Sequence, residues 1–240
     1  MGLAGKIRSV LAFRKLQPVT KRVVKENLTY LSVAKLMRIE GAICETADIP
    51  GDILEFGVAL GGSGIILAHD ARPDRRFHGF DVFGTIPPPT SEKDDVKSKD
   101  RYQIIMSGQS KGLGGAVYYG YRKDLFSAVK SSFASYGVPV DGRSVVLHQG
   151  LFEETWANTE VSQVALVHID CDWYDPVKFC LEACANRLSI GEIIIIDDYN
   201  DYGGCRIAVD EFLAERRDFT IEQGANPLLR KRPSEIRGEE

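Results

Sequence analysis

The sequence predicts a doubly wound α/β fold built on a mostly parallel sheet, and three of its features support this. Five short runs rich in Ile and Val have the length of strands, and helix-like segments separate them. Their apolar residues are consecutive and do not alternate with polar ones, which is typical of parallel strands that helices cover on both faces. The 240 residues suit one domain, and 44% hydrophobic with 27% charged residues is a globular composition. A disordered or fibrous protein is therefore excluded.

The predicted strands follow a helical segment, residues 1–50, which is expected to pack as a cap on the same edge of the sheet. The strands cover Asp52–Val58, Arg76–Phe83, Ser144–Gln149, Val164–Asp170 and Glu192–Asp198. After the fourth strand, Asp175 and Pro176 predict the N-cap and first residue of a helix, which Ser189–Gly191 ends. No internal repeat or domain boundary is found, so a single domain over residues 1–240 is expected.

The C-terminal part of the chain predicts one more helix and a hairpin. The helix is expected over Arg206–Arg217, with Val209 and Phe212 on its buried face. Phe219–Gln223 and Leu228–Arg232 then form a closing hairpin. With these two strands the predicted sheet has seven.

Residues 84–121 interrupt this alternation of strands and helices. They hold three consecutive prolines, a charged run at Ser91–Arg101, several glycines, and the tyrosines Tyr118, Tyr119 and Tyr121. A structureless connection longer than about 12–15 residues is usually a functional lid or a disordered linker. The aromatic content and the position after the second strand favour a lid. The tyrosines are expected either to stack on a sugar or aromatic acceptor or to form the core of this lid.

Charge, cysteine content and hydropathy limit the partners and the compartment. The 30 Lys and Arg against 34 Asp and Glu give a net charge of −4, which excludes a dedicated nucleic-acid binder. The five cysteines are odd in number and lack CxxC spacing, so we expect reduced thiols in the cytoplasm. No apolar run approaches the ~18–20 residues of a membrane helix, so no stable membrane insertion is expected. The basic N-terminal segment favours a solvated face or an oligomer contact over membrane attachment.

A glycine-rich turn follows the first predicted strand and precedes the helical run Ile65–His69. It contains Glu55, then Gly57, and ends with Gly61-Gly62-Ser63-Gly64. Glycines at such a turn let the backbone approach a ligand closely and direct amides at it. The spacing is not that of the dinucleotide motif GxGxxG, and Glu55 instead suits a ligand with an ammonium group. A plain strand-to-helix turn is the alternative, but four glycines and a serine exceed what such a turn needs.

Asp81 ends the second predicted strand, about twenty positions beyond the glycine-rich turn. In nucleotide-binding α/β folds, an acid at this place binds ribose hydroxyls. A helix cap or a loop acid is the alternative, and it would prevail without the glycine-rich turn nearby in the sheet.

Two strands each deliver acids at their C-terminal ends. Asp170 and Asp172 end the fourth strand, and Asp197 and Asp198 end the fifth. In a parallel sheet these ends share one edge, and four acids together repel one another unless a cation lies among them. Oxygen ligands select a hard ion such as Mg²⁺, whose open positions two neighbouring substrate hydroxyls can occupy. An acid outside the ligand set could take a proton, whereas the alternative is that one or two acids only cap the following helices.

Four other residues have simpler interpretations. His168 is expected to be a hydrogen-bonded core histidine and not a base. His148 either touches a cofactor or caps the turn after the third strand. Cys180 and Cys184, one helical turn apart, are expected to be small core residues.

Six motifs in order resemble the macrocin O-methyltransferase (TylF) family. They are Glu55-x-Gly57-Val58-x-x-Gly61-Gly62-Ser63, Gly79-Phe80-Asp81-x-Phe83, Gly150-x-Phe152-x-x-Thr155, His168-Ile169-Asp170-x-Asp172-x-Tyr174, Asp197-Asp198-Tyr199 and Gly204-Cys205-Arg206-x-Ala208-Val209-Asp210-Glu211-Phe212. The resemblance covers roughly residues 50–215. It implies a class I, Rossmann-like enzyme that methylates a sugar hydroxyl with S-adenosylmethionine (SAM) and Mg²⁺, and it makes self-association plausible.

The resemblance also implies roles for individual residues. The cofactor would contact Glu55, Gly57, Gly61 and Ser63 with its methionine part, Asp81 with its ribose, and Gly150 to Phe152 near its adenine, with Asp170 beside it. Asp170, Asp197 and Asp198 would bind the metal, which leaves Asp172 as the general base. The acceptor would be a sugar-containing small molecule.

Two other functions compete with this interpretation. Asp170-Cys171-Asp172 imitates the DxD metal site of a nucleotide-sugar glycosyltransferase. Such an enzyme has no use for the glycine-rich turn and the second acid pair. A non-catalytic oligomeric scaffold is the other alternative, and the intact acids at every site argue against it.

Overall fold

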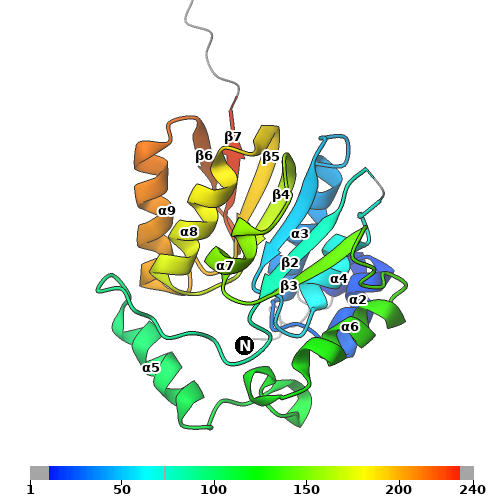
Figure 1. Ribbon diagram of the computed structural model, residues 1–240, viewed down its shortest axis with the longest axis vertical. Helices are drawn as coiled ribbons and strands as arrows, with labels where there is room; N and C mark the ends of the chain where they lie inside the picture. The colour runs from blue at the N-terminus through cyan, green and yellow to red at the C-terminus, as the bar shows by residue number, and fades with distance from the viewer. Residues whose placement is uncertain (1–10, 73, 233–240) are drawn as a thin grey trace, which may run out of the picture.

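The computed structural model describes residues 11–72 and 74–232, and their strands form one sheet (Figure 1). Its order is β3-β2-β1-β4-β5-β7-β6, with β1 to β5 parallel and β7 antiparallel to both neighbours. The strands are β1 (Asp52–Phe56), β2 (Phe77–Asp81), β3 (Val145–Gln149), β4 (Val164–Ile169), β5 (Leu188–Ile196), β6 (Phe219–Glu222) and β7 (Leu228–Lys231). The predicted doubly wound, mostly parallel seven-stranded sheet is confirmed.

Helices cover both faces of this sheet (Figure 1). One face carries α2 (Pro18–Lys25), α3 (Val33–Glu45), α4 (Gly62–Ala68) and α6 (Leu125–Ser135), and the other carries α7 (Phe152–Ala157), α8 (Tyr174–Ala185) and α9 (Gly203–Glu215). Each face of the sheet has its own hydrophobic core, and successive residues of a strand point to opposite faces. Ile53 packs with the first group of helices, and Leu54 packs with the second. Because both faces of each central strand are buried, the strand sequence is apolar at successive positions.

The helix after β4 starts earlier than the sequence predicts. Trp173 is the N-cap of α8, so Asp175 and Pro176 lie in the first turn and not at the cap and the first position. Proline is tolerated there because first-turn N–H groups have no acceptor within the helix. Asp175 lies favourably at the positive end of the helix dipole. Cys180 and Cys184 are buried on this helix, as predicted.

The prediction that Ser189–Gly191 ends α8 is wrong. The helix ends at Ala185, and β5 starts at Leu188, so these residues belong to the strand. Gly191 has a φ of 89° within β5, whose pairing with β4 is irregular between Val164 and Leu166. The glycine therefore marks an irregularity inside a strand and not a helix end. Similarly, α9 starts at Gly203 instead of Arg206.

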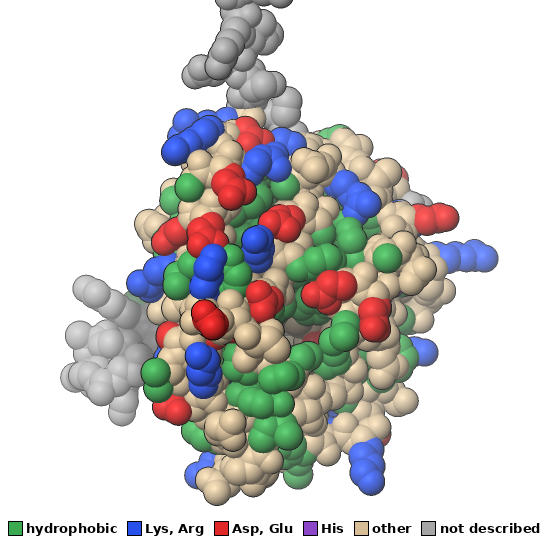
Figure 2. Space-filling model, turned by 60° about the vertical axis from the view of Figure 1, so that its left-hand side comes forward, with side chains coloured by type: hydrophobic (Ala, Val, Ile, Leu, Met, Phe, Trp, Pro, Cys, Tyr) green, Lys and Arg blue, Asp and Glu red, His purple; other side chains and the backbone are tan. Residues whose placement is uncertain are grey.

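Residues 84–121 are not structureless. They contain α5 (Val96–Met106) and two short 3-10 helices, Leu113–Gly115 and Tyr119–Tyr121. The sequence did not predict α5 because its charged residues show no apolar stripe. In Figure 1, α5 lies beyond the ends of the parallel strands. Hydrophobic side chains gather on the lower surface in Figure 2, where this segment lies, and its exposed large ones are Val96, Ile104, Met106 and Val117.

Asp95 fixes the start of α5. Its Oδ1 accepts a hydrogen bond from the N–H of Ser98 at 2.8 Å, and its Oδ2 accepts one from the N–H of Gly203 at 2.9 Å. Lys93 forms an ion pair with Glu211 of α9 at 2.7 Å. The N-terminal end of α5 is therefore joined to α9.

The N-terminal helices pack on α4 and reach the end of β5 through one lysine. Both α2 and α3 contact α4. Lys35 of α3 places its Nζ 2.7 Å from Asp197 Oδ2 and 2.8 Å from Asp201 Oδ2. Residues 1–10 of the expected cap lie outside the described part of the chain. Within residues 11–72 and 74–232, no helix combines the length and the apolar content needed to cross a bilayer.

Glu192 of β5 is a buried carboxylate without a hydrogen-bond partner among the described residues. Burial raises its pKa from 4.5 to about 8, and the charge of Lys231 offsets only part of that effect. Between these two pH values the folded protein holds a proton that the unfolded chain releases. The free energy of unfolding therefore decreases as the pH rises from about 4.5 to about 8.

We expect Glu192→Gln to remove this pH dependence. At about pH 5 the two proteins have similar stability, whereas at about pH 9 the variant is more stable by on the order of 2 kcal/mol, after allowance for solvent screening. Urea denaturation at both pH values measures the difference. Glu182→Gln, an exposed acid that pairs with Lys178 at 3.8 Å, is the control. An equal difference between variant and wild type at both pH values would contradict the prediction.

Candidate active site

A cavity of about 780 Å³ opens at the C-terminal edge of the sheet. Strand ends, the N-terminal helices and residues 84–121 all contribute to its walls. The predicted site residues on its walls are Gly57, Asp81, Phe152, Asp170, Asp172, Asp197 and Asp198. Four other predicted site residues do not line the cavity: Glu55, Gly61, Ser63 and Gly150. Their predicted contacts with a cofactor are therefore not supported by the shape of this cavity.

The turn after β1 brings the backbone to the cavity at Gly57. Gly57 has a φ of 95° and Gly61 a φ of 89°, both in the left-handed region that favours glycine. A Cβ on Gly57 would lie 1.8 Å from the carbonyl oxygen of Asp170. The turn and the end of β4 therefore approach as closely as only glycine permits. Gly61 is the N-cap of α4, and Ser63 lies in its first turn.

We expect Gly57→Ala to destabilise the protein by several kcal/mol, because the new Cβ meets rigid backbone in addition to the unfavourable φ. Gly115→Ala is the matched control, since Gly115 has a φ of 83° and open space around the position of a Cβ. The control should cost only about 1 kcal/mol, the cost of the backbone conformation alone. Urea denaturation of both variants measures this, and equal losses would show that the contact with Asp170 is unimportant.

Asp81 joins the end of β2 to the glycine-rich turn. Its Oδ2 accepts hydrogen bonds from the N–H groups of Val58 and Ala59, each at 2.8 Å, and its Oδ1 accepts one from Phe83. Burial raises the pKa of Asp81, and these donors oppose that change. The carboxylate is thereby held at the cavity wall, next to the turn.

Glu55 points into the protein and away from the cavity. Its side chain is 0% exposed, and its Oε1 lies 3.0 Å from Nδ1 of His168, which is also 0% exposed. His168 is thus the hydrogen-bonded core histidine that the sequence predicts. Burial alone would lower the pKa of His168, but Asp197 and Glu55 raise it to about 10. The two neighbouring carboxyl groups therefore favour the protonated form of the imidazole.

The structure brings three of the four predicted acids together. Asp170, Asp197 and Asp198 each offer a carboxylate oxygen, and these oxygens lie within 4.8 Å of one another. Burial raises the pKa of Asp170 and of Asp198, and repulsion between the acids adds to it. Burial acts on Asp197 in the same direction, but His168 and Lys35 lower its pKa. This all-oxygen set of mutually repelling carboxylates fits a hard divalent cation such as Mg²⁺.

Asp172 lies beside this group and not within it. Its backbone N–H donates to Asp198 Oδ2 at 3.1 Å, while its side chain lines the cavity. Burial and the charge of Asp197 raise the pKa of Asp172 to about 6, against the opposing charges of Arg101 and Lys35. Its φ of 60° is unusual for a residue other than glycine and is typical of strained functional positions.

The remaining candidates divide between the cavity and the core. Tyr118 and Tyr119 line the cavity, whereas Tyr121 donates its hydroxyl to the carbonyl of Ile105. His148 stacks on Phe80 with ring centroids 4.4 Å apart and lies outside the lining. Burial and the neighbouring His78 lower the pKa of His148 to about 4.

The wall residues that sequence reasoning missed include Lys35, Arg101, Trp173 and Tyr202. Lys35 lies 162 positions from Asp197 in the chain, so no local pattern connects the two. Arg101 belongs to a charged run that resembles a solvated surface. Trp173 and Tyr202 directly precede α8 and α9, and their closeness to the predicted acids was the one signal that could have identified them.

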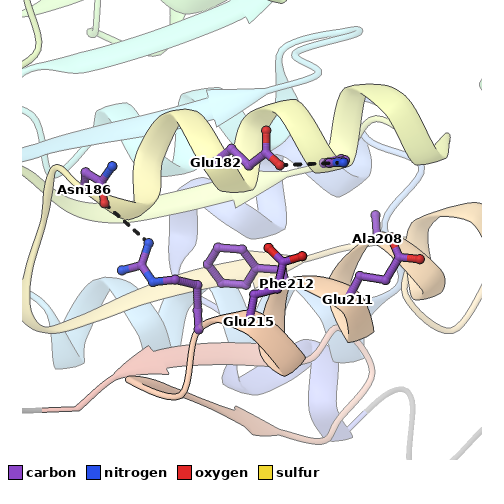
Figure 3. Close-up of a pocket in the computed structure, with 8 residues that line it drawn as sticks. Glu182, Asn186, Ala208, Glu211, Phe212 and Glu215 are labelled. Atoms are coloured by element: carbon purple, nitrogen blue, oxygen red, sulfur yellow. Dashed lines mark hydrogen bonds and ion pairs between the residues drawn. The ribbon is translucent and has the colours of Figure 1, made fainter.

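A second hollow lies between α8 and α9 and is smaller, about 240 Å³ (Figure 3). Arg216 donates a hydrogen bond to Asn186 Oδ1 at 3.4 Å. Lys178 lies 3.8 Å from Glu182, one turn further along α8. None of the predicted site residues lines it. The chemistry expected from the sequence therefore belongs to the larger cavity.

Solved structures with this fold identify its class. The structure superimposes on the O-methyltransferase NovP with a TM-score of 0.68 and 23% identity, covering 85% of this chain and 81% of that one. The O-methyltransferase TomG from Streptomyces achromogenes, solved in complex with SAM, gives a TM-score of 0.57 at 14% identity over 91% and 92% of the two chains. The fold is therefore that of a class I methyltransferase.

The chain belongs to the macrocin-O-methyltransferase (TylF) family, which it matches over residues 26–221. It is 26% identical over 199 residues to demethyldecarbamoylnovobiocin O-methyltransferase from Streptomyces niveus, covering 78% of this chain and 68% of that enzyme. It is 28% identical over 168 residues to 8-demethyl-8-(2,3-dimethoxy-alpha-L-rhamnosyl)-tetracenomycin-C 4'-O-methyltransferase from Streptomyces olivaceus, covering 68% of this chain and 58% of that enzyme. The chain is thus a SAM-dependent O-methyltransferase, as the resemblance implied.

This membership excludes the glycosyltransferase and scaffold alternatives. Among the described residues, the carboxylate of Asp170 converges with those of Asp197 and Asp198 after β5, whereas that of Asp172 is not part of this group.

Proposed function

We propose that the chain methylates a hydroxyl of a sugar or a glycosylated small molecule and that this reaction depends on Mg²⁺. The observation that carries the proposal is the convergence of Asp170, Asp197 and Asp198 on the wall of the cavity that Gly57 also borders. The Streptomyces olivaceus relative acts, as its name states, on a rhamnosyl tetracenomycin. That name supports a sugar hydroxyl as the acceptor.

The cofactor would lie beside the ends of β1 and β2. Bound SAM supplies the methyl group on a positively charged sulfur. Asp81 would accept hydrogen bonds from its ribose hydroxyls, since the glycine-rich turn already fixes the carboxylate. Gly57 would let the cofactor approach the backbone, and Phe152 would pack on the adenine. Asp170 would lie between the cofactor and the cation, since its carbonyl faces Gly57 and its carboxylate belongs to the acid group.

The acceptor would lie between the acids and residues 84–121. Asp170, Asp197 and Asp198 would hold Mg²⁺, which would supply Lewis-acid chemistry that lowers the pKa of an acceptor hydroxyl. Asp172 would accept the released proton, and its pKa of about 6 leaves it largely ionised at neutral pH. Aromatic walls such as Tyr118 would pack on the apolar face of the sugar. Orientation and electrostatics would then supply most of the acceleration.

Labelled SAM tests this proposal. The protein is incubated with a panel of glycosides, with Mg²⁺ or with an excess of chelator. Label transfer that requires Mg²⁺ supports both parts of the proposal, and transfer at full rate with chelator removes the metal from it. S-adenosylhomocysteine should raise the melting temperature in a thermal-shift assay, whereas a uridine diphosphate sugar with Mn²⁺ should not.

Four further expectations belong to the same proposal. Residues 84–121 would act as a lid, because Arg101, Tyr118 and Tyr119 line the cavity from that side. Residues 1–50 would form the cap of a single domain. The chain would self-associate, which size-exclusion chromatography with light scattering measures. A cytoplasmic location rests on the cysteine content and on the free thiols of all five cysteines.

A further inference from the structure

A row of buried charges links the end of β1 to the cation site. Glu55 and His168 are register partners on β1 and β4, and Asp197 follows directly after β5, the next strand of the sheet. The Glu55 Oε1 to His168 Nδ1 distance is 3.0 Å, and the His168 Nε2 to Asp197 Oδ1 distance is 3.9 Å. Lys35 completes the row on the far side, 2.7 Å from Asp197 Oδ2. Along the row, basic side chains alternate with carboxyl groups.

This row is costly to bury unless every member has its neighbour. The side chains of Glu55 and His168 are 0% exposed, and that of Asp197 is 4% exposed. Taking an ionised group out of water costs several kcal/mol, so a charge without a close opposite charge at this depth is strongly unfavourable. His168 is the only described cation within ion-pairing distance of Glu55. Glu55 therefore fixes the Nδ1 edge of the His168 ring, and the opposite Nε2 edge faces Asp197.

The position of Glu55 argues against a direct contact with the cofactor. The residue lies outside the cavity lining, and its second oxygen, Oε2, faces α4: a Cβ on Gly64 would lie 2.6 Å from it. Oε2 has no hydrogen-bond partner among the described residues. The carboxylate is thus enclosed between His168 of β4 and Gly64 of α4.

We propose that Glu55 and His168 are positioning residues for the cation site: Glu55 holds the imidazole of His168 in place behind Asp197, and the imidazole in turn orients the Asp197 carboxylate for a divalent ion. This inference rests on the Mg²⁺ dependence proposed above. It assigns to Glu55 a role through another residue, in place of the cofactor contact that the resemblance implied. Residues that support metal ligands from behind typically change metal affinity 10- to 100-fold when replaced.

The test measures two affinities in the same variant. Isothermal titration calorimetry gives the Mg²⁺ affinity and the S-adenosylhomocysteine affinity of wild type and Glu55→Gln. We expect the Mg²⁺ affinity to fall about 10- to 100-fold and the S-adenosylhomocysteine affinity to stay within about twofold. Glu192→Gln is the matched control, because it makes the same substitution at an equally buried glutamate of the same sheet, outside the cavity. Both affinities should be unchanged in this control.

Each other outcome has a distinct meaning. A loss of S-adenosylhomocysteine affinity with unchanged Mg²⁺ affinity would make Glu55 a cofactor ligand and overturn the inference. Unchanged affinities for both would also overturn it. Failure of the wild-type protein to bind Mg²⁺ would instead remove the metal from the proposed function, and the inference with it.

A second variant covers the case in which Glu55→Gln does not fold. Glu55→Gln/His168→Gln removes both charges of the buried pair together, so neither partner is left as an unpaired ion. We expect this double variant to fold and to show the same selective loss of Mg²⁺ affinity. A folded double variant with the Mg²⁺ affinity of wild type would overturn the inference.

Discussion

Replacing Asp172 with asparagine should lower kcat about 10²- to 10⁴-fold, the usual contribution of a general base. The carboxylate lines the cavity outside the group formed by Asp170, Asp197 and Asp198, so its loss leaves the cation site complete. Asparagine tolerates the φ of 60° at this position and keeps the backbone N–H that donates to Asp198. The substitution therefore removes the proton acceptor and little else.

Single-turnover rates with labelled SAM measure this effect, and calorimetry checks that S-adenosylhomocysteine and Mg²⁺ still bind. Asp210→Asn on α9, an exposed acid that bonds the Tyr199 hydroxyl, is the control and should turn over normally. Unchanged turnover of Asp172→Asn would exclude Asp172 as the base. A loss of Mg²⁺ binding in this variant would place Asp172 among the metal ligands instead.

Replacing Asp198 with alanine should abolish Mg²⁺ binding and, with it, methyl transfer. Asp198 contributes one of three carboxylates that lie within 4.8 Å of one another, and the two that remain cannot form the same oxygen-rich site. In wild type, Mg²⁺ at one hundred times its Kd should add about 2.7 kcal/mol of stability. The variant should gain nothing from the same addition.

Melting temperatures with and without Mg²⁺ measure this second effect. Asp201→Ala is a close control, because Asp201 pairs with Lys35 near the site but is not one of the three carboxylates. The control should keep its response to Mg²⁺. A normal Mg²⁺ response of Asp198→Ala would show that the cation binds elsewhere.

The sheet and the acids were predictable because their signals are local. The mainly apolar run from Val164 to Ile169 is by itself enough to predict a strand that is buried on both faces. An acid that directly follows such a run is then expected at the end of the strand. Because parallel strands end at one edge, the meeting of Asp170 with Asp197 follows from the strand order. The glycine-rich turn was equally recognisable, because its glycines are close together in the sequence. The structure explains one of them, since a Cβ on Gly57 would collide with the backbone of Asp170.

The features that the sequence did not reveal depend on contacts between distant parts of the chain. The apposition of Lys35 and Asp197 is decided by how α3 packs on α4, which no local pattern encodes. The direction of the Glu55 side chain depends on its strand neighbour His168, which lies 113 positions away. For α5, the residues of the helix have no apolar stripe to reveal a helical period.

The double role of Asp95 links the entrance of the cavity to the outer layer of the protein. One carboxylate satisfies N–H groups at the beginnings of both α5 and α9. Movement of α5 at this end would leave the first amide of α9 without its acceptor. The beginnings of α5 and α9 are therefore expected to stay together. We therefore expect any outward movement of α5 to be larger at its other end, beyond which Gly108 adopts a φ of 75°.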